Sequence, residues 1–313
     1  MTVGYETKLG KCICGDSLEV LPTLEDNSID LIVTSPPFSL QRHKAYGEVE
    51  QGEYVDWLLQ FGEAAYPKLK DTGSLVIDIG GAYQKGKPIK SLYPFRFMIA
   101  MCDRVGFCLA QDFYWHNTSA LPSPIEWVNK RKIRCKTSID TVWWFSKTEN
   151  PKSDIRRVLV PYSSRMQHLI NKPEDFVKEE GTVRPSGHVM GMKSWGKDNG
   201  GSIPPNLLQI SNSESNSQYL RFCKQLGIKA HPARFPGKLP EFFIQMLTDP
   251  DDLVVDIFGG SNTTGFVAEE NGRRWLSIDS NQEYVANSAL RFVGEEEANA
   301  SYQRIMAGEM LYL

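Results

Sequence analysis

The sequence predicts an α/β fold, a doubly wound parallel sheet with helices on both faces, interrupted by one long irregular insertion. Three observations predict it. Short apolar runs alternate with amphipathic stretches both before residue 150 and after residue 228, as strand–helix–strand units do. Several runs are continuously apolar, which is typical of strands buried on both faces. Between these limits the chain is rich in Gly, Ser, Asn and Pro and has no sustained periodicity, so that stretch is either functional or disordered.

The first 150 residues contain five expected strands and three expected helices. The helix expected at 53–69 places five apolar side chains on one face, as a helix covering a sheet does; these are Tyr54, Trp57, Leu58, Phe61 and Ala65. Gly106 is expected to end the helix that begins at residue 93. The expected strands are 10–16, 28–35, 73–81, 107–116 and 140–147, and the expected helices are 17–26, 53–69 and 93–106.

The same alternation resumes after the irregular stretch. We expect strands at 252–259 and 273–280, and helices at 239–249, 264–272, 282–293 and in the tail, 294–313. The irregular stretch contains one expected short helix, within 152–176. The predicted organisation is one domain in two parts, 1–150 and 229–313, with an insertion at 151–228.

Composition excludes several classes of protein. The 313 residues are 41% hydrophobic and 23% charged, which is ordinary for a chain with a core. No signal peptide or stretch of about 20 apolar residues is present, so we expect a soluble, cytoplasmic protein. Of six cysteines only Cys12 and Cys14 are close, and they lack the further ligands that a zinc site needs. We therefore expect reduced thiols and no metal.

The net charge of −3 excludes a wholly basic DNA coat. Two local basic runs remain, at 84–90 and 129–136, and the second contains Lys130, Arg131, Lys132, Arg134 and Lys136. Taken alone, each run is either a solvated surface or a field that attracts nucleic acid.

A glycine loop follows the strand expected at 252–259. Gly259 and Gly260 allow close approach of a ligand to the backbone, and the next helix start offers unpaired N–H groups. The nicotinamide fingerprint is absent, and the loop has Asp256 at its mouth and an acid, Asp279, after the next strand. An acidic strand end suits a ligand with an ammonium group, such as S-adenosylmethionine (AdoMet). The alternative is a tight turn with a capping acid.

Two neighbouring residues belong to the same hypothesis. Phe258 is a candidate for packing against the sulfonium end of the ligand. Asp16, at another strand end, is a candidate acceptor for the adenine amine, or equally the N-cap of the following helix.

The stretch Thr34-Ser35-Pro36-Pro37-Phe38 ends a buried strand in a stiff turn, because proline has no N–H donor and restricts the residue before it. A serine oxygen and a proline carbonyl held at fixed spacing are two acceptors for the hydrogens of an amine on a base ring. Phe38 offers a face for stacking. The alternative is that the prolines merely end the strand. Methylation of cytosine carbon 5 is disfavoured, because it uses a thiolate in a Pro-Cys dipeptide and no cysteine here follows a proline.

Several ordered blocks together resemble the DNA amino-methyltransferases of the β class, in which the catalytic motif precedes the cofactor motif. The blocks are "GDSLEVL", "TSPPF", "EYVDWLLQF", "IDIGGAYQKGKPIKSLY", "LPSPIEWVNKRKIR", "DTVWWFSKTENPKSD", "HPARFPGKLPEFFIQMLTDPDDLVVDIFGGSNTTG" and "LSIDS". The resemblance covers most of the chain outside about 173–228. It implies an AdoMet-dependent, Rossmann-like methyltransferase fold with permuted motif order and a target-recognition insertion.

The same resemblance implies roles for individual residues. The catalytic turn would be Ser35, Pro36, Pro37 and Phe38, and the Ser-Pro-Pro form implies cytosine N4 rather than adenine N6 as target. The AdoMet site would comprise Asp16, Asp256, Phe258, Gly259, Gly260, Ser261, Asn262, Thr263 and Asp279, with "ARFPGKLPE" along its methionine end.

A duplex base must be extruded before it can be methylated. On this hypothesis the run at 129–136 is a phosphate clamp. Of Trp143 and Trp144, which alternate on one strand, at most one faces the pocket. Sequence readout is assigned to the insertion, with candidates His188, Lys193, Trp195, Lys197 and Asn199.

The favoured function is site-specific methylation of cytosine N4 in double-stranded DNA, as the modification arm of a restriction-modification system with a possible separate endonuclease. The alternatives are an adenine N6 methyltransferase, a catalytically silent nucleic-acid-binding module on the same fold, and a methyltransferase for protein or RNA.

Overall fold

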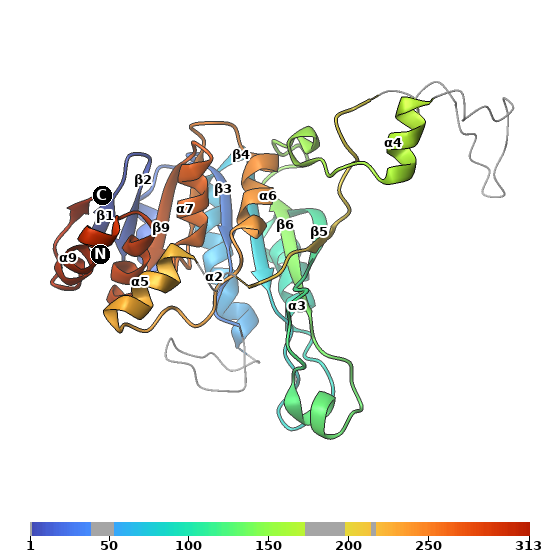
Figure 1. The fold of residues 1–313 in the computed structure, drawn as a ribbon, viewed down its shortest axis with the longest axis horizontal. Coiled ribbons are helices and arrows are strands. Elements are labelled where there is room, and N and C mark those ends of the chain that lie inside the picture. The colour runs from blue at the N-terminus through green and yellow to red at the C-terminus, as the bar shows by residue number, and fades with distance from the viewer. Residues whose placement is uncertain (1, 39–52, 173–197, 214–216) are drawn as a thin grey trace, which may run out of the picture. The chain divides into compact units, whose positions relative to one another are not determined.

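The computed structural model describes residues 2–38, 53–172, 198–213 and 217–313 (Figure 1). The chain forms two compact units. The larger comprises Met1–Ser153 with Asn206–Leu313, and the smaller comprises Asp154–Pro205. In the described ranges no helix is long and apolar enough to cross a membrane.

The larger unit is built on a sheet that has ten strands in the described ranges, in the order β10-β1-β2-β9-β8-β3-β4-β6-β5-β7. The strands are β1 (Thr2–Glu6), β2 (Gly10–Cys14), β3 (Ile29–Thr34), β4 (Leu69–Ile79), β5 (Cys108–His116), β6 (Ile139–Ser146), β7 (Leu207–Gln209), β8 (Leu253–Asp256), β9 (Arg274–Asp279) and β10 (Leu311–Tyr312).

The centre of the sheet is parallel, as predicted, but its flanks are mixed. The five central strands, β2, β9, β8, β3 and β4, run parallel to one another. Strand β6 is antiparallel to both β4 and β5, and β1 is antiparallel to β2. The expectation of an all-parallel sheet was wrong there. Strands β5 and β6 are joined by a loop without a helix that crosses the sheet, and such neighbours pair antiparallel.

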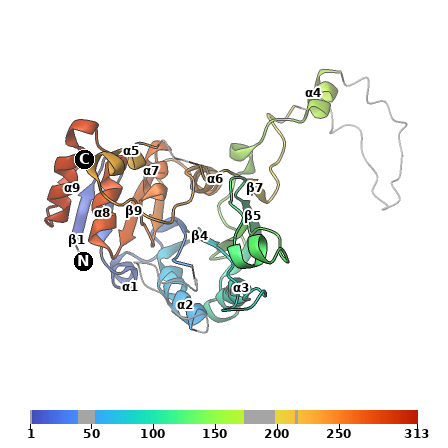
Figure 2. The same cartoon turned by 60° about the horizontal axis from the view of Figure 1, so that its bottom comes forward.

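Helices cover both faces of the sheet (Figure 2). One face carries α1 (Ser17–Val20), α2 (Tyr54–Ala65) and α3 (Tyr93–Ala100), and the other carries α6 (Lys238–Leu247) and α7 (Thr263–Glu270). Further helices of this unit are α5 (Gln218–Leu226), α8 (Gln282–Ser288) and α9 (Glu295–Met306), with short turns η1 (Leu21–Thr23), η2 (Tyr66–Lys68), η3 (Met101–Val105), η4 (Glu126–Lys130) and η8 (Ala289–Arg291).

Local predictions about α2 and α3 are confirmed. Four of the five residues expected on one face of α2 are buried, and Trp57 is half-buried. The helical segment that starts with α3 ends at Gly106, whose φ of 98° is in the left-handed region where glycine is favoured. Strand alternation places Trp143 against Phe95 of α3 and Trp144 against Phe113.

In the described ranges three strands, one α-helix and one short helical segment were not predicted: β1, β7, β10, α5 and η4. The helix expected at 294–313 was wrong at its end, because α9 stops at Met306 and β10 follows. Helix α5 buries Tyr219, Phe222 and Cys223 at helical spacing, a signal that the polar residues before it obscured. Both α5 and β7 belong to the larger unit, so the compact insertion is shorter than the 151–228 interval expected from composition. The smaller unit contains η5 (Ile155–Val158) and α4 (Ser164–Asn171), the one short helix expected in the irregular stretch.

Strands β3 and β8, far apart in sequence, are neighbours. Leu31 pairs with Val254 and Ile32 with Val255. The other neighbour of β3 is β4, and that of β8 is β9, so the strand order reverses between β3 and β8. Ligands bind at such a switch point in open α/β sheets. The prediction that these two strand ends meet is confirmed.

Candidate active site

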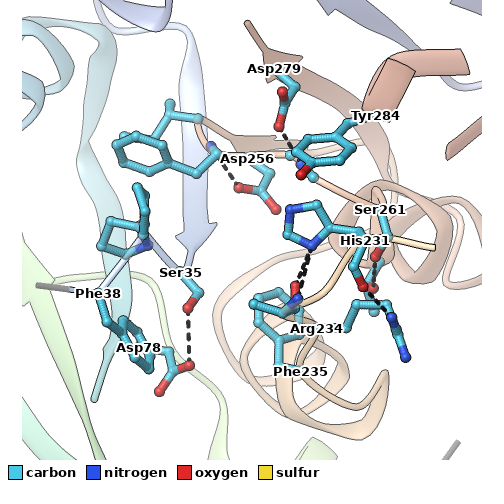
Figure 3. Close-up of a pocket in the computed structure, with 18 of the residues that line it drawn as sticks. Ser35, Phe38, Asp78, His231, Arg234, Phe235, Asp256, Ser261, Asp279 and Tyr284 are labelled. Atoms are coloured by element: carbon cyan, nitrogen blue, oxygen red, sulfur yellow. Dashed lines mark hydrogen bonds between the residues drawn. The ribbon is translucent and has the colours of Figure 1, made fainter. Parts of the chain in front are cut away.

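A pocket of about 1120 Å³ opens at the carboxyl ends of β3, β4, β8 and β9 (Figure 3). Both segments singled out from the sequence line it: the turn Ser35–Phe38, and the glycine loop with Asp256 and Asp279. The order of motifs along the chain therefore does not separate them in space.

The serine of the turn faces a carboxylate on the neighbouring strand. Thr34 pairs in parallel with Ile77, which brings Ser35 beside Asp78. The Ser35 hydroxyl donates a hydrogen bond to Asp78 Oδ2 over 3.2 Å, as Figure 3 shows. Asp78 was not among the predicted site residues. The sequence did contain a signal: Asp78 lies one residue before the end of β4, and β4 is the neighbour of β3, which leads into the turn.

Asp78 and a second carboxylate, Asp140, have perturbed pKa values. Burial raises the pKa of Asp78 well above its ordinary value, nearby Asp140 raises it further, and the Ser35 hydrogen bond opposes both. Burial raises the pKa of Asp140 to about 6, and Lys90 opposes the rise. Both carboxyls line the pocket. Perturbed carboxyls in a cleft are typical of functional sites.

Phe38 lies directly over Gly80, which follows β4. A Cβ atom at Gly80 would overlap the Phe38 ring and come within 2.9 Å of Asp140 Oδ1. Glycine at this position therefore allows the aromatic ring to sit beside the two carboxyls, with one face of the turn held against the end of β4.

The glycine loop wraps around the end of β9. Gly259 N–H donates to the carbonyl of Ile278 over 2.8 Å, and Gly260 N–H donates to Asp279 Oδ2 over 2.7 Å. Asp279 Oδ1 accepts from Asn281 N–H over 2.8 Å. Burial raises the pKa of Asp279, and the two backbone donors oppose the rise. A Cβ at Gly259 would overlap Ser277 Oγ and lie 3.2 Å from the Ile278 carbonyl, so a side chain here would require Ser277 or the loop to shift.

Asp256 is hydrogen-bonded both to the strand that leads into the Ser35 turn and to the glycine loop. Its Oδ1 accepts from Thr34 Oγ1 over 2.6 Å and from Phe258 N–H over 3.1 Å. Its Oδ2 accepts from Thr264 Oγ1 over 2.7 Å. Burial raises its pKa to about 6, although all three bonds oppose the rise. Asp256 thus ties the residue before Ser35 to the start of the glycine loop and to α7.

The remaining candidate cofactor residues differ in position. Asp16 caps α1, accepting from Leu18 N–H over 2.9 Å, so the suggested N-cap role is confirmed. It also lines the pocket, and the contact with the adenine amine stays a prediction. Phe258 lines the pocket and packs on Phe61 at 4.7 Å between ring centroids. Ser261 and Thr263 also line it.

Asn262 has a different environment. It is fully buried, accepts from Gly265 N–H as the N-cap of α7, and donates to the Tyr5 hydroxyl over 2.9 Å. Its φ of 49° lies in the left-handed region, which asparagine tolerates better than most residues. These contacts fix the glycine loop on its buried side.

Sequence reasoning did not single out several other residues that line the pocket. They are Trp115, Asn117, His231, Arg234 and Tyr284. His231 packs edge-on against Tyr284 at 4.4 Å between ring centroids, and Arg234 donates to the His231 carbonyl. His231 and Arg234 both lie in the stretch "HPARFP", in which no spacing or periodicity distinguishes their side chains.

The candidate DNA contacts lie away from the pocket lining or outside the described residues. Lys130, Arg131, Lys132, Arg134 and Lys136 lie on the loop between β5 and β6, and all five are exposed. His188, Lys193, Trp195 and Lys197 fall outside the described residues, and Asn199 lies in the smaller unit. Trp143 and Trp144 are both buried, and neither lines the pocket.

All six cysteines are unpaired. Within the described ranges no three His, Cys, Asp or Glu side chains gather in a way that would hold a metal ion.

Comparisons with known proteins agree with this geometry. Residues 29–290 match the DNA methylase family. The chain is 63% identical over 313 residues to the type II methyltransferase M.PvuII of Proteus hauseri, covering 99% of this chain and 92% of that protein. It is 24% identical over 297 residues to M.BglII of Bacillus subtilis, covering 95% and 72%.

Two solved structures are also similar. The PvuII DNA methyltransferase described as cytosine-N4-specific has a TM-score of 0.81 at 55% identity, covering 99% of this chain and 97% of that one. The complex of M1.HpyAVI with SAM has a TM-score of 0.53 at 19% identity, covering 91% and 99%, and that likeness concerns the fold alone.

Proposed function

The chain belongs to the DNA methylase family, and from that membership we propose that it transfers a methyl group from AdoMet to N4 of cytosine within a short sequence of double-stranded DNA. The observation that carries this proposal is the Ser35–Asp78 pair, which lies in the same pocket as the glycine loop. The cytosine-N4-specific name of the 55% identical solved relative and the Ser-Pro-Pro-Phe form of the turn both favour cytosine over adenine.

The glycine-loop side of the pocket fits AdoMet. An added Cβ at Gly259 would meet Ser277 Oγ and the Ile278 carbonyl of β9, so glycine there keeps the loop packed closely on the end of that strand, where it lines the pocket. Asp279 and Asp16 supply carboxylates, which suit the ribose hydroxyls and the adenine amine, and Phe258 and Tyr284 supply aromatic faces. AdoMet bound there supplies an electrophilic methyl group on a sulfonium.

The Ser35–Phe38 turn increases the reactivity of the N4 amine of cytosine. The N4 lone pair is delocalised into the cytosine ring, so N4 attacks a methyl group poorly while the amine stays planar. Ser35 Oγ and a proline carbonyl of the turn accept from the two N4 hydrogens, which favours a tetrahedral nitrogen with its lone pair toward the methyl group. Phe38 stacks on the base and sets its plane.

Asp78 completes the proton balance. The Ser35 hydroxyl donates to Asp78, which leaves the Ser35 oxygen free to accept from N4. As the N4–methyl bond forms, the methyl–sulfur bond would break and its electron pair would stay on the sulfur, giving S-adenosylhomocysteine. One N4 proton would pass to Ser35 Oγ, and the Ser35 proton to Asp78 Oδ2. A carboxylate with a raised pKa is a better acceptor for this proton than a solvated one.

DNA binding is assigned to the basic run and to the insertion. The cations at 129–136 contact phosphates, which positions the duplex without reading it. The insertion, expected at 151–228, reads the base sequence, and His188, Lys193 and Trp195 stay candidates for base-edge contacts. We also propose that a cognate restriction endonuclease acts independently on the same sequence, since several relatives are type II methyltransferases.

The function is tested by incubating plasmid DNA with AdoMet labelled on its methyl group and identifying the labelled nucleoside. The expected product is N4-methylcytosine at one short sequence. N6-methyladenine would favour the adenine alternative, and AdoMet binding with no labelled DNA would favour a silent binding module.

Asp279→Ala is expected to weaken AdoMet binding by about tenfold or more, because hydrogen bonds to a charged group contribute about 1.5–3 kcal/mol and the substitution also releases Gly260 and Asn281 N–H. Calorimetric titration with AdoMet measures the change. Asp103→Ala, which removes an exposed carboxylate, is the control. Unchanged affinity in Asp279→Ala would remove this residue from the site.

Gly259→Ala is expected to reduce AdoMet affinity at least as much, because the new methyl group would overlap Ser277 Oγ and lie 3.2 Å from the Ile278 carbonyl. Gly294→Ala is the matched control, since no atom lies within 4 Å of its added Cβ. The same titration is used, with circular dichroism to confirm folding. Normal AdoMet affinity in folded Gly259→Ala would show that the loop tolerates a side chain at this position and would contradict the requirement for glycine.

A further inference from the structure

Exposed aliphatic side chains gather on one part of the larger unit. This part, here called the rim lobe, consists of residues 80–92 and 117–138, the loops that follow β4 and β5. In Figure 1 its second segment, in green, extends beyond β5 and β6. Leu121 is 80% exposed, Ile125 56% and Ile133 47%. Single exposed aliphatic residues are ordinary, so the surroundings of Leu121 decide whether it has a role.

The rim lobe is internally supported, and its tip is not a loose loop. Trp127 is 8% exposed and forms a small core, with the Arg131 guanidinium 5.0 Å from its ring centroid. The two loops are joined where Arg134 Nε donates to the Pro88 carbonyl over 3.0 Å. Lys136 Nζ donates over 2.9 Å to the carbonyl of Ala120, directly before Leu121. Leu121 is thus presented outward from a fixed backbone.

The rim lobe is rooted on the wall of the active-site pocket. Asn117, at its start, and Asp140, just after its end, both line the pocket. The root is closed by a hydrogen bond from Asn117 N–H to the Ser138 carbonyl over 2.8 Å. Leu121 is four residues from Asn117, and four residues span at most about 14 Å. The side chain therefore lies within the dimensions of a DNA duplex from the place where the target base must enter.

Charge on the rim lobe matches nucleic acid. The 117–138 segment contains five cationic side chains and one carboxylate, Glu126. Glu126 is itself paired, with Arg131 at 3.0 Å and Lys130 at 3.5 Å. An apolar tip on a strongly cationic support suits insertion into a polyanionic, stacked duplex, where apolar side chains enter between base steps. It suits a second copy of the chain poorly, because two such lobes repel each other.

Extrusion of the target cytosine leaves a gap in the stack and a guanine without its partner, and both cost free energy. Building on the proposed function, we propose that Leu121 is the wedge that fills this gap while the cytosine occupies the pocket. Leu121 is a positioning residue: it touches the DNA left behind, and it lowers the free energy of the extruded state without contacting the reacting atoms.

The test compares two duplex substrates under single-turnover conditions, one fully paired and one with an abasic site in place of the guanine opposite the target cytosine. Leu121→Ala is expected to lower the methylation rate on the paired duplex by about tenfold or more, because it removes most of the apolar surface that fills the gap. On the abasic duplex the cytosine has no base pair to break, so the loss of methylation rate in Leu121→Ala is expected to be severalfold smaller. Leu121→Met is expected to keep most of the activity on both.

Three controls separate the possible outcomes. Met310→Ala removes an exposed side chain beside β10, at the opposite edge of the sheet, and should leave both rates unchanged. Ser35→Ala should lose activity equally on both duplexes, because its defect follows extrusion. Wild-type rates on the paired duplex, or an equal loss on both duplexes, in Leu121→Ala would overturn the wedge. A wild-type enzyme that methylates neither duplex would instead contradict the proposed function itself.

Discussion

Ser35→Ala is expected to lower the rate of methyl transfer by about 10²- to 10⁴-fold, the range typical of a positioned group that handles a proton in the transition state. The substitution removes the hydroxyl that donates to Asp78 and so breaks the route from N4 to the carboxylate. The AdoMet dissociation constant should change by less than about twofold, because Ser35 acts on the base side of the pocket. Single-turnover kinetics and calorimetry measure the two quantities.

Ser28→Ala provides the matched control for Ser35→Ala. Ser28 precedes β3 as Ser35 follows it, and its hydroxyl donates only to the nearby Glu25 carbonyl over 2.7 Å. Its rate should match that of the wild type. Equal losses of rate and AdoMet affinity in Ser35→Ala would mean that the turn supports the cofactor site rather than the amine.

Asp78→Asn should give the second large effect, a loss of about 10²-fold or more in rate. The amide keeps an oxygen that accepts from Ser35 but takes up no proton, so the positioning of Ser35 survives and the proton route does not. Asp71→Asn, an exposed change on the same strand, β4, is the control. A rate near that of the wild type in Asp78→Asn would exclude the carboxylate as the proton acceptor.

The pH dependence of the wild type follows from the same group. Burial raises the pKa of Asp78 well above its ordinary value, so the anion that accepts the proton is lost at a higher pH than for a solvated carboxylate, whose pKa is about 3.9. The rate should therefore fall on acidification with an apparent pKa above that value, and Asp78→Asn should abolish this limb. A limb that persists in Asp78→Asn belongs to another group.

Stability should change in the opposite direction to activity. A carboxyl whose pKa is raised in the folded state contributes stability below its unfolded pKa and loses it as pH rises through the folded pKa. Once the pH exceeds this folded-state pKa, the wild type bears the cost of a buried anion, and Asp78→Asn does not. The melting temperature of Asp78→Asn should therefore rise relative to that of the wild type as the pH is raised, which thermal unfolding at several pH values measures.

Much of the fold could be predicted because apolar periodicity reports burial directly. The central strands and α2 follow from it. The antiparallel setting of β6 leaves no trace in periodicity. Its signal was the connection, since no crossover helix was expected between the strands at 107–116 and 140–147. Strand β10 is only two residues long, Leu311–Tyr312, too short to show any period.

The site was partly predictable for a similar reason. Residues with unusual backbone requirements, such as Pro36, Pro37 and Gly259, mark their positions in the sequence. Asp78 and Asp140 do not, because their importance comes from strands that become neighbours only in the folded sheet. Asp256 was singled out as a ligand contact, yet its observed contacts are three protein donors.

The most direct test of the central claim is a crystal structure with S-adenosylhomocysteine and a duplex that contains the target cytosine. We expect the extruded base to stack on Phe38 with N4 between Ser35 Oγ and the product sulfur, and the product to lie along Gly259 and Asp279. A cytosine bound outside this pocket, or a product held away from the switch point between β3 and β8, would contradict the account.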